Sequence, residues 1–200
     1  MIVMNLDPIK GDCKIDGFPN WITLDDCSVE ITREPKESGH TGTTDLQLGM
    51  PDCGPVSLKK TSDKASIYLQ KMAIGGGALG KDSKCQIVWL ESGIGHGDEQ
   101  KFNKYMEIEL TRPVLKKYAV DASGNDRAVE NLELIYSKIL MTYYERSPTD
   151  GSQIQHGPQG WDLVSGKPCT SSGSYARGPR PAGEGRGGSS QSITESPCPN

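Results

Sequence analysis

The sequence predicts a mainly β protein: an antiparallel barrel or sandwich of two sheets, with one short α-helix inserted after the third strand. Three observations lead to this fold class. Apolar and polar side chains alternate with a period of two along several segments, as in strands with one buried face. Only one segment, near residues 65–72, has helical spacing. Turns rather than helices separate the strands, which favours antiparallel pairing.

The clearest strand is predicted at 106–110, where apolar residues at even positions alternate with glutamates. Residues 56–59 show the same alternation, with valine and leucine on one face. The nearly continuous apolar run at 85–90 is typical of a central strand. These segments supply the buried faces that two packed sheets require.

Two longer segments lose their alternation partway. Between 22 and 31 the apolar parity changes at Asp25-Asp26, and between 132 and 143 it changes at Ser137-Lys138. A single strand of the second length would be either bulged at the change or covered on both faces.

The helix is predicted from apolar residues spaced i, i+3, i+4 and i+7, which share one helix face: Ala65, Tyr68, Leu69 and Met72. Ser62, Asp63 or Ser66 can cap its start, and Gly75–Gly77 can end it. Residues 75–80 match G-x-G-x-x-G literally. They end a helix instead of opening one after a strand, so they predict no dinucleotide site.

Composition divides the 200 residues into a domain and a tail. From 165 to 200, 20 of 36 residues are Gly, Ser or Pro, and the only large apolar side chains are Tyr175 and Ile193. Such a segment buries too little surface to offset the entropy lost on ordering. We expect a folded domain at 1–164 and a flexible tail at 165–200.

Charge and motifs exclude several classes of function. The net charge of −4 is unlike that of a nucleic-acid-binding domain, and no apolar run is long enough to span a bilayer. The N-terminus lacks the features of a Sec signal peptide. The three histidines are isolated, as expected of surface loops, and no nucleophile motif is present. We therefore predict no catalytic, cofactor-binding or metal-binding residues.

The six cysteines have no close-spaced pair of the kind that binds zinc. Their spacing favours free thiols in a reducing compartment, with structural disulfides or a metal site as the alternatives.

Several segments in matching order together resemble the hemolysin-coregulated protein (Hcp) family. They are 60–66 before the helix, 122–134 with its continuation 136–139, 105–110, and 160–163. The segment 122–134 (Ala-Ser-Gly-Asn-Asp-Arg-Ala-Val-Glu-Asn-Leu-Glu-Leu) is the most specific of them. The resemblance covers about residues 1–164.

The resemblance implies a non-enzymatic structural subunit of the type VI secretion tube. Family members are similar two-sheet or barrel domains that assemble into hexameric rings, which stack into a hollow tube. The implied partners are further copies of the chain, a contractile sheath, a spike protein and small effectors. The implied location is the bacterial cytoplasm, followed by secretion without a Sec signal. Two alternatives stay open: a tube subunit of a phage-tail-like particle, and a monomeric β-barrel that binds a ligand or acts as an effector.

The polar stretch from Arg33 to Pro51 is long for a loop in a compact domain, and loops of this length are usually functional or disordered. In the resembling family, an extended segment in this region reaches from one ring toward the next. We therefore expect part of the stretch to contact the neighbouring ring, with a plain surface loop as the alternative. The residues concerned are Glu34, Pro35, Lys36, Glu37, Ser38, Gly39, His40, Thr41, Gly42, Thr43 and Thr44.

Overall fold

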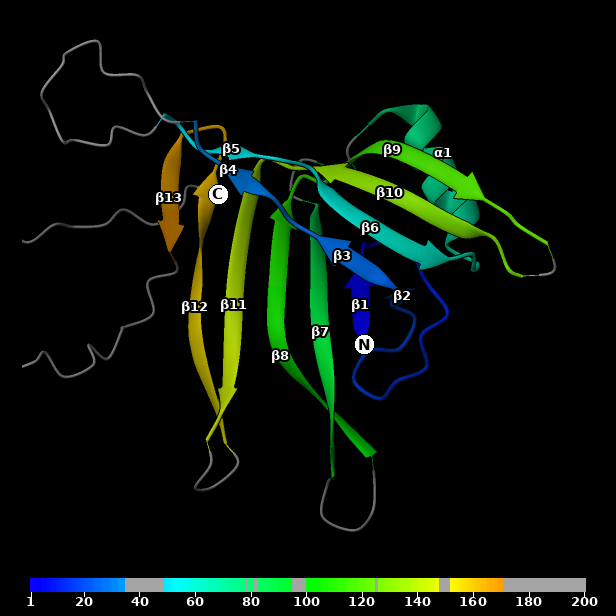
Figure 1. The fold of residues 1–200 in the computed structure, drawn as a ribbon, viewed down its shortest axis with the longest axis horizontal. Helices are drawn as coiled ribbons and strands as arrows, with labels where there is room; N and C mark the ends of the chain where they lie inside the picture. Colours follow the sequence, from blue (N-terminus) through cyan, green and yellow to red (C-terminus); the bar gives the residue numbers. More distant parts are fainter. Residues whose placement is uncertain are drawn as a thin grey trace, which may run out of the picture.

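The structure is a computed structural model that describes residues 1–34, 49–77, 79–80, 83–94, 100–124, 126–147 and 152–170. The described residues form two main antiparallel sheets, one small two-stranded sheet and a single short helix (Figure 1). This confirms the mainly β, two-sheet fold class predicted from the sequence.

The large sheet has seven strands in the order β13-β12-β11-β8-β7-β1-β2, and every neighbouring pair is antiparallel. In chain order its strands are β1 (Ile2–Asn5), β2 (Ile22–Leu24), β7 (Lys84–Ile94), β8 (Gln100–Thr111), β11 (Lys138–Arg146), β12 (Gln153–Asp162) and β13 (Lys167–Thr170).

The small main sheet has four strands in the order β3-β6-β10-β9. Its strands are β3 (Asp26–Ser28), β6 (Val56–Thr61), β9 (Val114–Asp121) and β10 (Val129–Ile135). A separate pair joins β4 (Ile31–Thr32) to β5 (Asp52–Cys53), and the helix α1 (Ser66–Gly75) follows β6.

The predicted position of the helix after the third strand is wrong, because α1 follows the sixth. The strands β3, β4 and β5 are two or three residues long, which is too short for an alternation to be recognised. The predicted buried face holds for Ala65, Leu69 and Met72, whereas Tyr68 is exposed. The predicted end is confirmed, since Gly76 adopts a left-handed φ of 62° and its N–H donates to the Met72 carbonyl.

Both losses of alternation mark places where the chain passes from one main sheet to the other. At Asp25 it leaves β2 in the large sheet for β3 in the small one, and at Tyr136-Ser137 it leaves β10 for β11. The core lies between the sheets, so a chain that changes sheet must turn the opposite side toward the core. Neither of the predicted explanations, a bulge at the change or cover on both faces, applies to a single strand at 132–143.

The core between the sheets is built from the residues that the alternation predicted. Leu58, Leu132 and Leu134 of the small sheet share one buried cluster with Ile108 and Leu110 of the large sheet. Burial of such side chains is the main contribution to stability in a fold of this kind.

The central strand predicted at 85–90 is confirmed as part of β7, which lies between β8 and β1. Its apolar run is continuous because β7 is covered on both faces. Val88 and Leu90 form a second cluster with Val3 and Cys13, and Phe18 packs against that cluster from the segment between β1 and β2.

A charged cluster lies inside the core where β6 leads into α1. The Lys60 Nζ, which is fully buried, is 2.9 Å from Glu130 Oε2 and 2.9 Å from Asp63 Oδ1. The Ser62 hydroxyl donates to Glu130 Oε1 at 2.8 Å. Burial opposes the charge on Glu130, yet hydrogen bonds from Ser66, Lys60 and Ser62 hold the pKa of its carboxyl below the ordinary value. The cluster therefore joins β6, which carries Lys60, and β10, which carries Glu130, to the start of α1.

The predicted tail, 165–200, begins within the described residues. Lys167–Thr170 form β13 and pair with β12, from Asp162↔Lys167 to Gln159↔Thr170. Residues 171–200 lie outside the described residues, and the domain boundary at 164 stays a prediction.

Candidate functional site

The large sheet is wider than the sheet packed against it. The small main sheet covers the part made of β1, β2, β7 and β8, while β4 and β5 lie near one end of β11 and β12 (Figure 1). A groove of about 570 Å³ lies on the inward face of β11, β12 and β13, beside the β4–β5 pair. It is lined by Ile31, Arg33, Pro51, Cys53, Ile139, Met141, Tyr143, His156, Gly157, Gln159, Gly160, Trp161, Pro168, Cys169 and Thr170.

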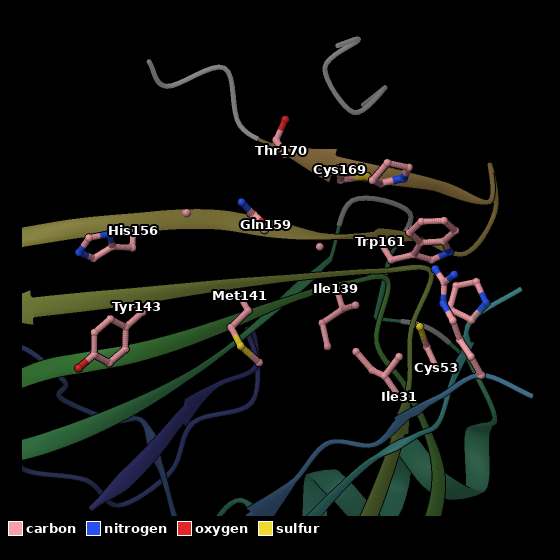
Figure 2. A pocket seen from close by; sticks show the side chains of 15 residues that line it. Ile31, Cys53, Ile139, Met141, Tyr143, His156, Gln159, Trp161, Cys169 and Thr170 are labelled. Carbon is pink, nitrogen blue, oxygen red and sulfur yellow. The ribbon is translucent and has the colours of Figure 1, made fainter. Parts of the chain in front are cut away.

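The groove floor follows from the alternation in β11. Ile139, Met141 and Tyr143 all point inward because they occupy every second position (Figure 2). Ile139 packs in the main core and is 3% exposed, whereas Met141 is 40% and Tyr143 51% exposed. One face of β11 therefore has its apolar side chain in the core at Ile139 and on an open surface at Met141 and Tyr143.

The neighbouring strand β12 comes unusually close to β11. A Cβ atom on Gly160 would overlap the Ile139 carbonyl, so no other residue fits there without moving a backbone. The pairing shifts between Met141 and Tyr143, opposite Gly157, which has a φ of 97°. These two glycines shape the groove floor, and Trp161 closes one end of it (Figure 2).

The opposite side of the groove is the base of the long polar stretch. Ile31 pairs with Cys53 and Thr32 with Asp52, and the Gly49 N–H donates to the Glu34 carbonyl at 2.8 Å. The two ends of the stretch are therefore held together as a stem. Of the eleven residues predicted to contact a neighbouring ring, Glu34 lies at this stem, and 35–44 lie outside the described residues.

Few groups near the groove can carry out chemistry. His156 lies 2.8 Å from Glu145 Oε2, with both side chains about half exposed, and it belongs to β12 rather than to a loop as predicted. Burial raises the pKa of the Cys53 thiol, which keeps it protonated and poorly nucleophilic. Within the described ranges, no three His, Cys, Asp or Glu side chains come together as metal ligands. His40 and His96 lie outside those ranges. The groove is suited to binding an apolar surface.

The five cysteines within the described residues are in two states. Cys13, Cys27, Cys53 and Cys85 are free thiols, as the spacing favoured, and burial raises the pKa of Cys27 to about 12. Cys169, on the groove wall, is disulfide-bonded, so the favoured interpretation is wrong for this cysteine.

Away from the apolar cluster of Val3, Val88 and Leu90, the outward face of the large sheet is polar. Lys84 Nζ lies 2.9 Å from Glu109 Oε1, and Lys104 Nζ lies 3.0 Å from Glu107 Oε2. The Tyr144 hydroxyl donates to the same Glu107 oxygen at 2.9 Å. These glutamates occupy the outward positions that the alternation predicted.

Within the part of the chain that the structure describes, no helix has the length and apolar character needed to cross a membrane.

Comparison with known proteins places the chain among secretion proteins. Residues 3–143 match the model of the family described as "Type VI secretion system effector, Hcp". No curated protein sequence matches.

Solved structures of low sequence identity share the fold. A type six secretion system protein is 19% identical with a TM-score of 0.69, and the match covers 84% of this chain and 98% of that one. Hcp1 from Salmonella typhimurium is 18% identical with a TM-score of 0.57, covering 84% and 97%. A type VI secretion system effector from Yersinia pestis is 15% identical with a TM-score of 0.56, covering 81% and 99%.

Proposed function

Because the chain belongs to the Hcp family of type VI secretion proteins, we propose that it forms hexameric rings that stack into the hollow secretion tube. The observation that carries the proposal is the family match over residues 3–143. The family consists of secreted structural proteins that are not enzymes, and this chain is one of them. The proposed partners are copies of itself, the contractile sheath, the spike protein and small effectors. Before assembly it resides in the bacterial cytoplasm.

A closed ring of identical subunits needs two different, complementary surfaces on each subunit. The large sheet ends at β13 on one side and at β2 on the other, and the four-stranded sheet ends at β3 and β9. Edge strands carry unpaired backbone groups and readily pair with another chain. These dissimilar edges support a head-to-tail ring contact between neighbouring subunits.

If the sheet edges join the ring, the faces of the sheet line either the lumen or the outer wall. The outward face of the large sheet carries the paired charges Lys84–Glu109 and Lys104–Glu107, and it is balanced in sign. Such a face is well solvated and has no strong attraction for one kind of charge. It suits a water-filled lumen that carries soluble effectors.

We assign Glu34 to Thr44 to ring-on-ring contact. The support is the stem of β4 and β5, which anchors both ends of this stretch beside the groove. A loop whose two ends are already held together loses less entropy when a partner orders it than a free segment would lose.

Two other functions compete with the tube. A tube subunit of a phage-tail-like particle would share the fold and the ring. A monomeric β-barrel that binds a ligand or acts as an effector is favoured by one observation, the apolar groove of about 570 Å³. Light scattering coupled to size exclusion, followed by electron microscopy, separates them. We expect a mass six times that of the 21.6 kDa chain and rings with a central hole. A stable monomer at all salt concentrations would refute the ring.

The loop is tested separately by replacing 34–44 with a short Gly-Ser linker. We expect hexamers to persist while stacking weakens and secretion is lost. The matched control places the same linker over eleven residues of the tail, at 171–181, and should leave stacking unchanged. Long tubes and normal secretion in the first variant would show that the loop makes no ring-on-ring contact. Monomers would place it in the contact within the ring.

A further inference from the structure

The open groove lies where the last part of the chain begins. Its wall includes Pro168, Cys169 and Thr170 of β13, and Thr170 is the last described residue. The remaining residues, 171–200, therefore start at the groove rim. Met141 lies two strands from Thr170, across Gln159, and with Tyr143 it leaves an apolar surface in the same groove.

The disulfide of Cys169 indicates where the end of that segment is held. Cys169 is disulfide-bonded, and Cys13, Cys27, Cys53 and Cys85 are free thiols. The sequence has six cysteines, so Cys198 is the one partner left within the chain. We propose that a Cys169–Cys198 disulfide closes residues 170–197 into a loop, and that this loop covers the groove on β11, β12 and β13.

A disulfide requires Cα atoms about 4–7 Å apart, so both ends of the loop lie at the groove wall. Tyr175 follows Cys169 by six residues, and Ile193 precedes Cys198 by five. A chain of six residues reaches at most about 20 Å, so both side chains stay close to the groove. They are the only large apolar side chains after residue 170, and the closed loop holds them beside an apolar surface at high effective concentration.

The middle of the segment supports the same arrangement. It contains Pro179-Arg180-Pro181, a short sequence that favours the extended polyproline conformation. Such segments bind grooves lined with aromatic side chains. Tyr143 and Trp161 supply aromatic rings in this groove. The proposed occupant is therefore this chain's own C-terminal segment, and it does not depend on whether rings form.

The bond forms by thiol–disulfide exchange. The Cys169 and Cys198 thiols lose two electrons and two protons, and a second disulfide, from a small molecule or an oxidoreductase, is reduced to two thiols. A dithiol such as dithiothreitol reverses the reaction and becomes a cyclic disulfide. The loop should thus be closed under oxidising conditions and open under reducing ones.

Peptide mapping tests the bond in the full-length chain, purified without reductant and treated with N-ethylmaleimide. Trypsin does not cut before Pro168 or Pro181, so Cys169 falls in peptide 147–177 and Cys198 in peptide 187–200. We expect these peptides to be linked within one chain, four cysteines to be alkylated, and all six to react after reduction. Alkylated Cys198, or peptide 147–177 linked to a second copy of itself, would overturn the proposal.

Hydroxyl-radical footprinting tests whether the loop covers the groove. We expect modification of Met141, Tyr143 and Trp161 to rise several-fold in Cys198→Ser relative to the oxidised wild type, with Met1 unchanged. The control is Cys53→Ser, which removes a free thiol from the groove and leaves the disulfide intact. It should match the wild type. Circular dichroism establishes that both variants are folded.

Two results would overturn the docking. Equal modification of the groove in the wild type and in Cys198→Ser would show that the loop does not cover it. If the groove residues were protected from modification in both the wild type and Cys198→Ser, and this protection disappeared on dilution, a second copy of the chain would be what covers the groove.

Discussion

Two halves of the large sheet carry the same kind of apolar face and differ in what covers it. In β8, Ile108 and Leu110 are at most 1% exposed beneath the four-stranded sheet. In the adjacent β11, Met141 and Tyr143 lie on the same side of the sheet and remain about half exposed. An alternating pattern therefore shows that a strand face can be buried. It does not show which element buries it, or whether that element belongs to the same fold.

The largest expected effect lies on the covered side. Glu130→Gln removes the buried partner of Lys60 and leaves its charge with Asp63 alone, so we expect a loss of about 3–5 kcal/mol in the free energy of unfolding. Glu133→Gln is the matched control on the same strand. Its carboxylate faces outward toward Lys116 and Lys117, and the stability should change little. Urea unfolding measures both, and equal losses would contradict a special role for the buried pair.

The two halves can be compared directly by truncating one side chain in each. Leu110→Ala leaves a cavity between the sheets and should lower the free energy of unfolding by about 2–5 kcal/mol. Met141→Ala removes a side chain that the packed sheets leave 40% exposed, and under reducing conditions, which open the proposed C-terminal loop, the loss should stay below about 1 kcal/mol. The same unfolding measurement applies. A loss at Met141 as large as that at Leu110 under these reducing conditions would mean that the groove is filled without the disulfide.

Acid should weaken the covered half. The pKa of Glu130 lies below its ordinary value of 4.5, so its contribution to stability is present above that pH. The contribution is lost as the pH falls through the lower pKa of the folded state. The free energy of unfolding of the wild type should therefore fall below about pH 4.5, and that of Glu130→Gln should fall less steeply. Parallel curves would show that other carboxylates govern acid unfolding.

An effect smaller than those at Glu130 and Leu110 is expected at the wall of the groove. Although burial opposes its charge, hydrogen bonds from Ser165 and Val164 hold the pKa of Asp162 below the ordinary value. Asp162→Asn weakens this turn before β13 and should cost about 1 kcal/mol. Hydrogen exchange should quicken at Lys167–Thr170 and stay unchanged in β8. Unchanged exchange in β13 would show that its pairing with β12 does not need the turn.

The groove was the feature hardest to predict. The alternation at 139–143 indicated a strand face, and nothing near those residues signals that the opposing sheet stops short of it. The stem at β4 and β5 was also invisible, because each strand has two residues. The proposed ring contact at 34–44 rests on the family resemblance, and it stays a prediction.

The buried charge was missed for a similar reason. Lys60 shares the parity of Val56 and Leu58, but a lysine is normally placed at the surface. Its partner Glu130 is 70 residues away along the chain, and their strands pair only once the small main sheet has formed. A single sequence offers no local sign that these two positions meet.

The sequence by itself determined the strand faces, the end of the single helix and the segments that resemble the Hcp family. Each depends on preferences expressed within a few residues: side-chain alternation, helical spacing, or a glycine that adopts a left-handed conformation. Only the tertiary structure decided which sheet each strand joins, that Lys60 meets Glu130, and that the four-stranded sheet leaves half of the large sheet uncovered. These outcomes depend on contacts between residues far apart in the chain, and such contacts exist only after the sheets have packed together.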